Sequence, residues 1–373
     1  MRHSAKFLAR CRPRSPLYFG SSRTRKAWCV HLDEPSWWYR EAPSTAAKIL
    51  QPVGVLYGWI ARARYERSRA HKARLPVICV GNFTAGGTGK TPLVLYLCDK
   101  LKAAGHEPVA LTRGYGGRLM GPYWVNAASD RARDVGDEAL LLARRVPTLV
   151  ARNRRLGAEA IERGPHPVSV IIMDDGLQNP ALAKDLTLAV VDGRRGIGNG
   201  LVLPAGPLRA ALDMQLELTD GVVVNEPAQS QGGVADWLRH RFTGPVLRAN
   251  TVPAAAVDWL RGTKVLAWAA IGAPERFFSL LRTLGADLIE AVKFPDHHWL
   301  SQAEATALLE AARTGAATLV TTEKDAARLG GEAGMLADLS RHSRPLPVKL
   351  QFSPAEAERL SVLVEAALAA HRR

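Results

Sequence analysis

A glycine-rich segment, residues 82–91, combines the residue types that bind phosphate. It lies between two apolar runs, 76–80 and 92–98. Glycines allow backbone angles at which consecutive amides turn toward an anion, and the start of a helix also favours negative charge. Lys90 adds a cation for the outer phosphates, and Thr91 offers a hydroxyl to a magnesium ion. The predicted nucleotide-binding loop comprises Thr84, Ala85, Gly86, Gly87, Thr88, Gly89, Lys90 and Thr91.

The loop is a variant of the strict phosphate-binding pattern. That pattern begins with another glycine, and Thr84 occupies the position here. A glycine-rich turn that only closes a strand-to-helix corner is the alternative. The strand pattern before the loop and the helix pattern after it favour phosphate binding.

Two adjacent aspartates, Asp174 and Asp175, follow the apolar run 168–173. Nucleotide-hydrolysing folds hold magnesium with a carboxylate at the end of a buried strand. By itself such a pair is more often a polar strand end or a helix cap. Together with the upstream loop, it predicts a magnesium site formed by Thr91, Asp174 and Asp175.

Other polar residues follow apolar runs elsewhere in the chain. Arg113 and Tyr115 lie in a glycine-rich segment, where the arginine suits a phosphate and an ordinary exposed loop is the alternative. Asp137 opens a predicted helix, and by itself it is best interpreted as a helix cap. His297 and His298 lack the further ligands that zinc requires, which leaves a base assembly or a capped turn.

The elements that position these residues alternate between strand and helix patterns, which predicts a parallel sheet. The predicted fold class is α/β: a P-loop NTPase-like, mostly parallel sheet flanked by helices, a second smaller α/β domain and an N-terminal interfacial helix. The predicted parts are a basic extension (1–31), a membrane-associating helix and basic segment (32–75), a P-loop kinase core (76–244), and a second α/β domain with a C-terminal helix (245–373). The segment after Leu346 can close either domain.

The net charge of +15 is concentrated near the N-terminus of the 373-residue chain. Eight cations precede the first acid, Asp33, and residues 1–31 have the composition of an organelle transit peptide. A disordered extension or a start codon assigned too far upstream are the alternatives. The basic residues are not interleaved with aromatic platforms, so nucleic acid is a disfavoured partner. The four cysteines show no paired spacing, which fits a reducing compartment.

An apolar stretch at residues 46–61 is shorter than the ~20 residues that a bilayer span needs. It contains Tyr57 and Trp59 and is followed by six cations between residues 62 and 74, opposed only by Glu66. This pattern is typical of a helix at a membrane surface, and a helix packed on the protein's own core is the alternative.

The motifs together, in this order, resemble the tetraacyldisaccharide 4'-kinase family. The resemblance covers about 44–329 and includes the nucleotide-binding loop. The other matching segments are 113–117, 135–138, 174–178, 198–200, 203–209, 294–298 and 321–325.

The resemblance implies transfer of the γ-phosphoryl group of ATP, with Mg²⁺, to the 4'-hydroxyl of a tetraacylated disaccharide 1-phosphate, giving lipid IVA. It implies a peripheral enzyme at the cytoplasmic face of the bacterial inner membrane, in contact with anionic lipid. It also implies that Asp137 is the base, that His297 tunes it, and that Lys90 holds phosphate. Further implied contacts to phosphates and acceptor are Arg113, Tyr115, Glu138, Arg154 and Arg209.

Two residues depart from the family pattern. Asn179 stands where histidine is usual, and Ala210 stands where an acid commonly follows the arginine. The second departure affects how the magnesium shell is completed. The alternative functions are a P-loop NTPase acting on a soluble acceptor, and a membrane scaffold switched by nucleotide.

Overall fold

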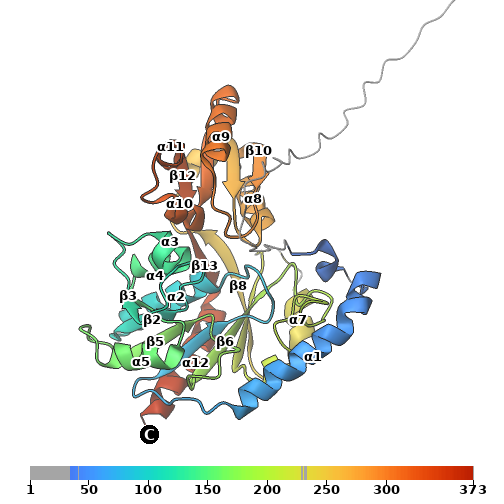
Figure 1. The fold of residues 1–373 in the computed structure, drawn as a ribbon, viewed down its shortest axis with the longest axis vertical. Coiled ribbons are helices and arrows are strands. Elements are labelled where there is room, and N and C mark those ends of the chain that lie inside the picture. The colour runs from blue at the N-terminus through green and yellow to red at the C-terminus, as the bar shows by residue number, and fades with distance from the viewer. Residues whose placement is uncertain (1–33, 41, 228–229, 231–232, 373) are drawn as a thin grey trace, which may run out of the picture. The chain divides into compact units, whose positions relative to one another are not determined.

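The computed structural model describes residues 34–372 apart from 41, 228–229 and 231–232 (Figure 1). The predictions for residues 1–31 lie outside the described residues. The described chain forms two sheets with helices around them.

The larger sheet has nine strands and is mostly parallel. Its strands are β1 (Val77–Gly81), β2 (Pro108–Thr112), β3 (Tyr123–Trp124), β4 (Thr148–Val150), β5 (Val170–Asp174), β6 (Leu186–Asp192), β7 (Gly221–Asn225), β8 (Val246–Pro253) and β13 (Val348–Phe352). Their order is β13-β8-β7-β6-β1-β5-β2-β4-β3, with antiparallel pairing only at β13 and β3. The sequence-based prediction of a mostly parallel sheet is confirmed.

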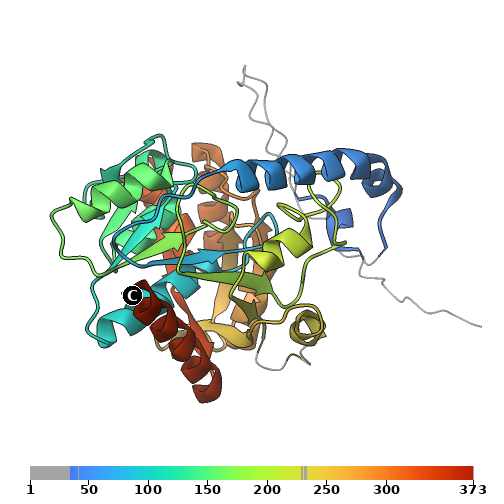
Figure 2. The same cartoon turned by 90° about the horizontal axis from the view of Figure 1, so that it is seen from below.

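Helices cover both faces of this sheet. They are α2 (Lys90–Ala103), α3 (Ala132–Val135), α4 (Asp137–Ala143), α5 (Arg154–Glu162), α6 (Leu212–Glu217), α7 (Gly233–Arg239) and α12 (Pro354–His371). Ile78 and Val80 of β1 pack with α2 and α12, whereas Val77 and Cys79 pack with α5. Figure 2 shows α5 and α12 on opposite sides of the sheet. Central strands buried on both faces explain the nearly continuous apolar runs in the sequence.

The smaller sheet is also parallel. Its strands are β9 (Lys264–Ala269), β10 (Asp287–Lys293), β11 (Thr318–Thr322) and β12 (Ser343–Leu346), in the order β10-β9-β11-β12. Its helices are α8 (Pro274–Thr283), α9 (Gln302–Thr314), α10 (Glu323–Leu329) and α11 (Met335–His342).

The smaller sheet and its helices form one unit, called the smaller unit below, and the rest of the described fold is the larger unit. The smaller unit is inserted between two paired strands of the larger sheet. The chain leaves through β8 and returns through β13, and these strands pair with Pro253 opposite Val348. The division between the sheets therefore differs from the boundary at residue 244 predicted from the sequence. The segment after Leu346 completes the larger unit: β13 pairs with β8, and α12 packs in the hydrophobic core on one face of the larger sheet.

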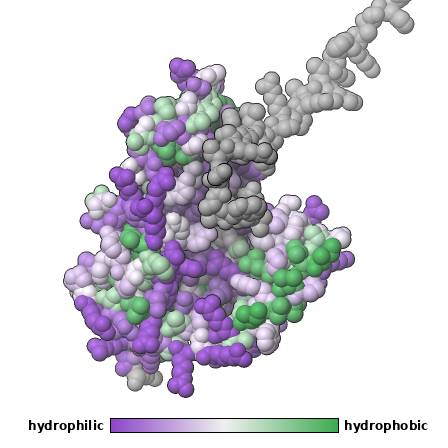
Figure 3. Space-filling view, viewed as in Figure 1, coloured by the Kyte–Doolittle hydropathy of each residue, from purple (hydrophilic) through white to green (hydrophobic). Residues whose placement is uncertain are grey.

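Helix α1 (Thr45–Arg67) carries its large apolar side chains on the outside. The exposed set is Ile49, Val53, Val55, Leu56, Tyr57, Trp59 and Ile60. Figure 3 shows the apolar patch at the position that α1 occupies in Figure 1. The buried side consists of small residues, among them Gly54 and Gly58, which lie against Val202. Among the described residues, no helix is long and apolar enough to cross a membrane.

Replacing Gly54 with valine is expected to weaken the packing of α1. A Cβ atom at this position would lie 2.7 Å from the Val202 carbonyl oxygen, which belongs to the backbone. Overpacking of this kind costs about 1–3 kcal/mol of unfolding free energy, measurable by urea denaturation. The control is Val55→Ala on the exposed side of α1, with an expected change within about 0.5 kcal/mol. An unchanged urea midpoint for Gly54→Val would contradict the close packing.

Candidate active site

The nucleotide-binding loop connects β1 to α2 at the carboxyl edge of the larger sheet. Gly86 and Gly89 have φ angles of +89° and +96°, which favour glycine. Both are also closely surrounded, since a Cβ atom would meet Glu34 at Gly86 and Asn225 at Gly89. The loop is held in place by its neighbours, including a 2.8 Å hydrogen bond from the Ala85 amide to the Pro207 carbonyl. Helix α2 then begins at Lys90, so its N-terminus faces the loop.

Asp175 lies beside two cations at this loop. Its Oδ1 atom is 3.5 Å from Lys90 Nζ and accepts a 2.8 Å hydrogen bond from Arg209 Nη1. Burial alone would raise the pKa of Asp175, but Lys90 and Arg209 bring it below the usual range. The structure therefore brings together three predicted site residues from three separate segments of the sequence.

Asp174, at the end of β5, is buried with an unsatisfied oxygen. Its Oδ2 atom is 3.4 Å from the Thr112 hydroxyl, whereas Oδ1 has no hydrogen-bond partner. Burial, with the nearby charges of Glu138 and Asp175, raises the pKa of Asp174 to about 7. An unpaired buried carboxylate oxygen among other carboxylates suits a cation.

The described residues contain no group of three or more His, Cys, Asp or Glu side chains arranged to hold a metal. A magnesium ion usually binds one or two carboxylates and completes its shell with water and substrate phosphates. Thr91 at the start of α2 and Asp174 at the end of β5 suit such a partial site.

Asp137 lies at the start of α4 and is almost completely buried. Its Oδ1 atom accepts a 2.8 Å hydrogen bond from the Glu138 amide, and its Oδ2 atom is 3.3 Å from His297 Nδ1. Arg328 also donates to Oδ2, through Nε at 2.7 Å. Burial would raise the pKa of Asp137, but the hydrogen bond from His297 and the charge of Arg328 bring it well below the usual range.

Arg328 was not identified in the sequence analysis. It comes from α10 of the smaller unit and, like Asp137, is almost completely buried. Its position three residues after Asp325, on the same face of a helix, was the one available signal. The pairing partner Asp137 lies 191 positions away and is not indicated by that spacing.

A large cleft of about 1350 Å³ lies between the loop and the smaller unit. The predicted site residues that line it are Ala85, Gly86, Gly87, Thr88, Gly89, Lys90, Thr91, Arg113, Tyr115, Glu138, Asp175, Arg209 and His297. Thr84, Asp137 and Asp174 are not in this lining, because all three are buried. His297 is thus the member of the Asp137–His297 pair that faces the cleft, with the Tyr115 ring 4.8 Å from its own.

Arg154 occupies a different place from the one expected for a substrate contact. Its guanidinium is buried and donates to the Ala151 and Asp174 carbonyl oxygens. In this structure it supports the end of β5 rather than lining the cleft. His298 likewise lies apart from the pair, since it stacks on Phe294 and hydrogen-bonds Glu304.

The two residues that depart from the family pattern make hydrogen bonds to residues close to them in the sequence. The Ala210 side chain is buried, and its carbonyl accepts a 2.8 Å hydrogen bond from Gln215. The Asn179 side chain accepts a 3.0 Å hydrogen bond from the Ala181 amide within a turn.

Glu34 and Arg195 lie at the loop and were also not identified from the sequence. Arg195 Nη1 donates to Glu34 Oε2 at 2.9 Å and to the Gly272 carbonyl at 3.0 Å. Glu34 in turn lies against Gly86. This arginine therefore joins the segment before α1, the loop and the smaller unit.

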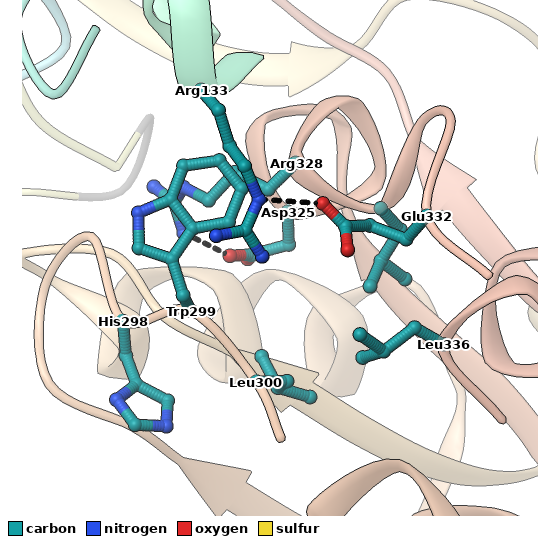
Figure 4. A pocket seen from close by; sticks show the side chains of 9 residues that line it. Arg133, His298, Trp299, Leu300, Asp325, Arg328, Glu332 and Leu336 are labelled. Carbon is teal, nitrogen blue, oxygen red and sulfur yellow. Dashed lines mark hydrogen bonds and ion pairs between the residues drawn. The ribbon is translucent and has the colours of Figure 1, made fainter. Parts of the chain in front are cut away.

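A second group of contacts lies beside α10, at the interface between the larger and the smaller unit, which is called the seam below. Arg133 of α3 donates to Glu332 at 2.8 Å, and its guanidinium lies 4.4 Å from the Trp299 ring centre. Figure 4 shows this pair next to Arg328 and Asp325. Arg133 and Arg328 thus both cross the seam, but only Arg328 contacts Asp137.

The parallel sheet and the loop between β1 and α2 define an α/β protein of the P-loop class. The profile of the family described as Tetraacyldisaccharide-1-P 4'-kinase matches residues 46–367. The chain belongs to this family, and the resemblance noted from the sequence motifs is confirmed.

Similar proteins agree with this assignment. A Tetraacyldisaccharide 4'-kinase of Rhodopseudomonas palustris (strain BisB5) is 48% identical over 306 residues, which cover 82% of this chain and 89% of the relative. Another, from Nitrobacter winogradskyi, is 48% identical over 330 residues, which cover 88% and 96%. The crystal structure of the "apo" form of LpxK from Aquifex aeolicus in complex with ATP has a TM-score of 0.66 and 25% identity, and the match covers 86% of this chain and 99% of that one.

Proposed function

We propose that this protein transfers the γ-phosphoryl group of ATP to the 4'-hydroxyl of a tetraacyldisaccharide 1-phosphate. The observation that carries the proposal is that Lys90 and His297 line one and the same cleft, with Asp137 behind the imidazole. A phosphate-binding loop and a proton-accepting pair are the two parts that transfer to an alcohol requires. The family and the ATP complex of a related chain support ATP as the donor.

The Asp137–His297 pair is proposed to take the proton of the acceptor hydroxyl. His297 faces the cleft, and the Asp137 carboxylate behind it stabilises the positive charge that the imidazole gains. The hydroxyl oxygen then forms a bond to the γ-phosphorus. The bond between this phosphorus and the β–γ bridging oxygen breaks, and ADP leaves with that oxygen.

Lys90 and Arg209 are proposed to hold the phosphates. Both lie at the loop and line the cleft, and both now contact Asp175. Arg113 and Tyr115 line the same cleft, with Tyr115 beside His297, and both are proposed to contact the acceptor. Glu138 forms an ion pair with Lys324 at the cleft wall, which holds both charges near the acceptor site.

A magnesium ion fits the residues at the end of β5. Thr91, Asp174 and Asp175 would hold it, because Asp174 has a buried oxygen without a partner. When bound, the ion neutralises charge that develops on the transferred phosphoryl group. Asp175 also keeps Lys90 in place through their 3.5 Å ion pair.

Peripheral attachment to the cytoplasmic face of the inner membrane is proposed from α1. Its exposed apolar side chains form a surface that suits the acyl region of a bilayer. The cations between residues 62 and 74 follow directly, and each contributes about 1 kcal/mol beside anionic lipid. An acceptor with four acyl chains stays in the membrane, so the enzyme must reach it there.

Replacing both Ile49 and Trp59 with glutamate is expected to reduce binding to anionic phospholipid vesicles at least tenfold. Both side chains are exposed, and burying one such side chain contributes about 1.5–3 kcal/mol. The measurement is cosedimentation with vesicles. Val362→Glu in α12 is the control, since Val362 is a comparably exposed apolar residue away from α1. Retention of the protein after a high-salt wash, with release only by detergent, would contradict peripheral attachment.

The proposed reaction is tested with ATP labelled at the γ-phosphorus and the lipid disaccharide. We expect the label in a lipid product that carries a new 4'-phosphate. Release of all label into water would contradict the kinase proposal and favour a nucleotide-switched scaffold. Transfer only to a soluble acceptor would favour the other alternative.

A further inference from the structure

We infer that Arg328 is a positioning residue for the phosphoryl transfer proposed above: from the smaller unit, it holds the Asp137 carboxylate in place and ionised behind His297. The inference rests on the proposed function. It assigns a specific task to Arg328 of α10, a residue that does not line the cleft.

Arg328 contacts two carboxylates, one backbone carbonyl and the imidazole of His297, whose Nδ1 atom lies 3.5 Å from its Nη2 atom. Its Nε atom donates to Asp137 Oδ2 at 2.7 Å, and Nη2 is 2.5 Å from the same oxygen. Its Nη1 atom donates to Asp325 Oδ1 at 2.6 Å and to the Ala270 carbonyl at 2.7 Å. All three nitrogen atoms of the guanidinium are therefore used, and its orientation is fixed.

The second carboxylate is itself fixed by its surroundings. The Thr322 hydroxyl donates to Asp325 at 2.6 Å, and the Ala270 amide lies 3.2 Å from both of its oxygens. Asp325 thus connects Arg328 to the end of β9 and the start of α10. The guanidinium reaches Asp137 from a rigid support rather than from a loop.

The contact between Arg328 and Asp137 is a buried ion pair, so it affects the charge of the carboxylate as well as its packing. Asp137 is 3% exposed and Arg328 is 5% exposed, so water screens neither. A buried carboxylate without a cation favours its protonated form. A protonated Asp137 would not stabilise a positive charge on His297.

The other charged and titratable groups around Asp137 do not replace Arg328. From α10 they are Lys324 and Asp325, from its own helix Glu138, and from the loop after β10 His297, with Asp296 3.7 Å from the Nε2 atom of that imidazole. Lys324 is already paired with Glu138, and Asp325 is an acid. Without Arg328, the carboxylate would keep His297 and the Glu138 amide as its direct partners.

The contact also divides the proton-accepting assembly between the two units. Asp137 belongs to α4 of the larger unit, whereas His297 and Arg328 belong to the smaller one. The contact between Arg328 and Asp137 exists only while α10 packs against α4.

The test compares Arg328→Gln and Arg328→Lys with Arg133→Gln, which removes another arginine from the same seam. Arg133 crosses to Glu332 without contacting Asp137. The measurements are kcat for lipid phosphorylation from pH 5 to 9, the Kd for ATP, and thermal unfolding. We expect Arg328→Gln to lower kcat at neutral pH about 10²-fold while the Kd for ATP changes less than threefold.

The direction of the pH effect separates positioning from a structural role. Arg328 lies beside both Asp137 and His297, so loss of its charge makes the pair easier to protonate. The acid-side inflection of kcat should therefore move to higher pH in Arg328→Gln. Arg328→Lys restores one positive charge and should move the inflection only part of the way. Arg133→Gln should keep the wild-type profile.

Three results would overturn the inference. These are an Arg328→Gln profile that matches wild type, an equal shift in Arg133→Gln, or an Arg328→Lys variant that folds and shows no shift. If Arg328→Gln does not fold, the lysine variant alone decides. A wild-type protein that makes no lipid product would instead refute the proposed function and leave no pH profile to compare.

Discussion

Lys90→Ala is expected to lower kcat by about 10²- to 10³-fold, the loss typical of removing one positioned charge from a transition state. Lys90 is the first residue of α2, directly after a glycine in the left-handed region, and its ammonium lies at the cleft beside Asp175. Charge accumulates there as the phosphoryl group transfers, so the cation acts mainly on the chemical step. The measurement is phosphorylation of the lipid acceptor at saturating ATP.

The matched control for this variant is Lys102→Ala on the same helix. Lys102 lies in the last turn of α2, and its ammonium donates to the Arg145 carbonyl at the surface. The two variants remove the same charge from one helix, but only one removes it from the cleft. Equal activity of both variants would contradict the phosphate-binding role of Lys90.

The sequence predicted the loop and the strands around it because these features are local. Residues 82–91 lie in one segment, and the glycines that the turn requires are visible without knowledge of the fold. The aspartates at the end of β5 follow the same logic, since parallel strands bring their carboxyl ends to one edge of the sheet.

Contacts between the two units were not predictable in this way. Arg328 reaches Asp137 only because α10 packs on α4, and helical spacing carries no information about a partner on another element. The same reason explains Arg154, which the family resemblance implied as a contact to phosphates or acceptor, although packing buries it against the end of β5. Residue type indicated which groups bear charge, but the packing decided which of them face the cleft.

Packing also decides which member of the Asp137–His297 pair faces the cleft. The resemblance assigned the base to Asp137, and sequence patterns give no exposure for either residue. In the structure His297 lies at the cleft wall and Asp137 lies behind it. We therefore treat the two as one proton-accepting unit, in which the imidazole meets the acceptor and the carboxylate supplies the charge.

This arrangement predicts that Asp137→Asn lowers kcat by about 10²- to 10⁴-fold, the usual contribution of general base catalysis. An amide keeps the size of the side chain but cannot stabilise a positive imidazole. The Kd for ATP should change little, because Asp137 does not line the cleft at the nucleotide-binding loop. Single-turnover transfer to the lipid acceptor measures the loss at the chemical step.

Asp134→Asn is the control three residues earlier in the chain. Asp134 pairs with Arg118 at the surface, so its loss should leave kcat within twofold of wild type. Asp137→Asn also leaves Arg328 with Asp325 as its remaining carboxylate, and thermal unfolding must show that the variant is folded at the assay temperature. A folded Asp137→Asn protein with wild-type single-turnover rates would exclude the pair as the proton acceptor. The hydroxyl would then have to lose its proton directly to solvent or to the transferring phosphate itself.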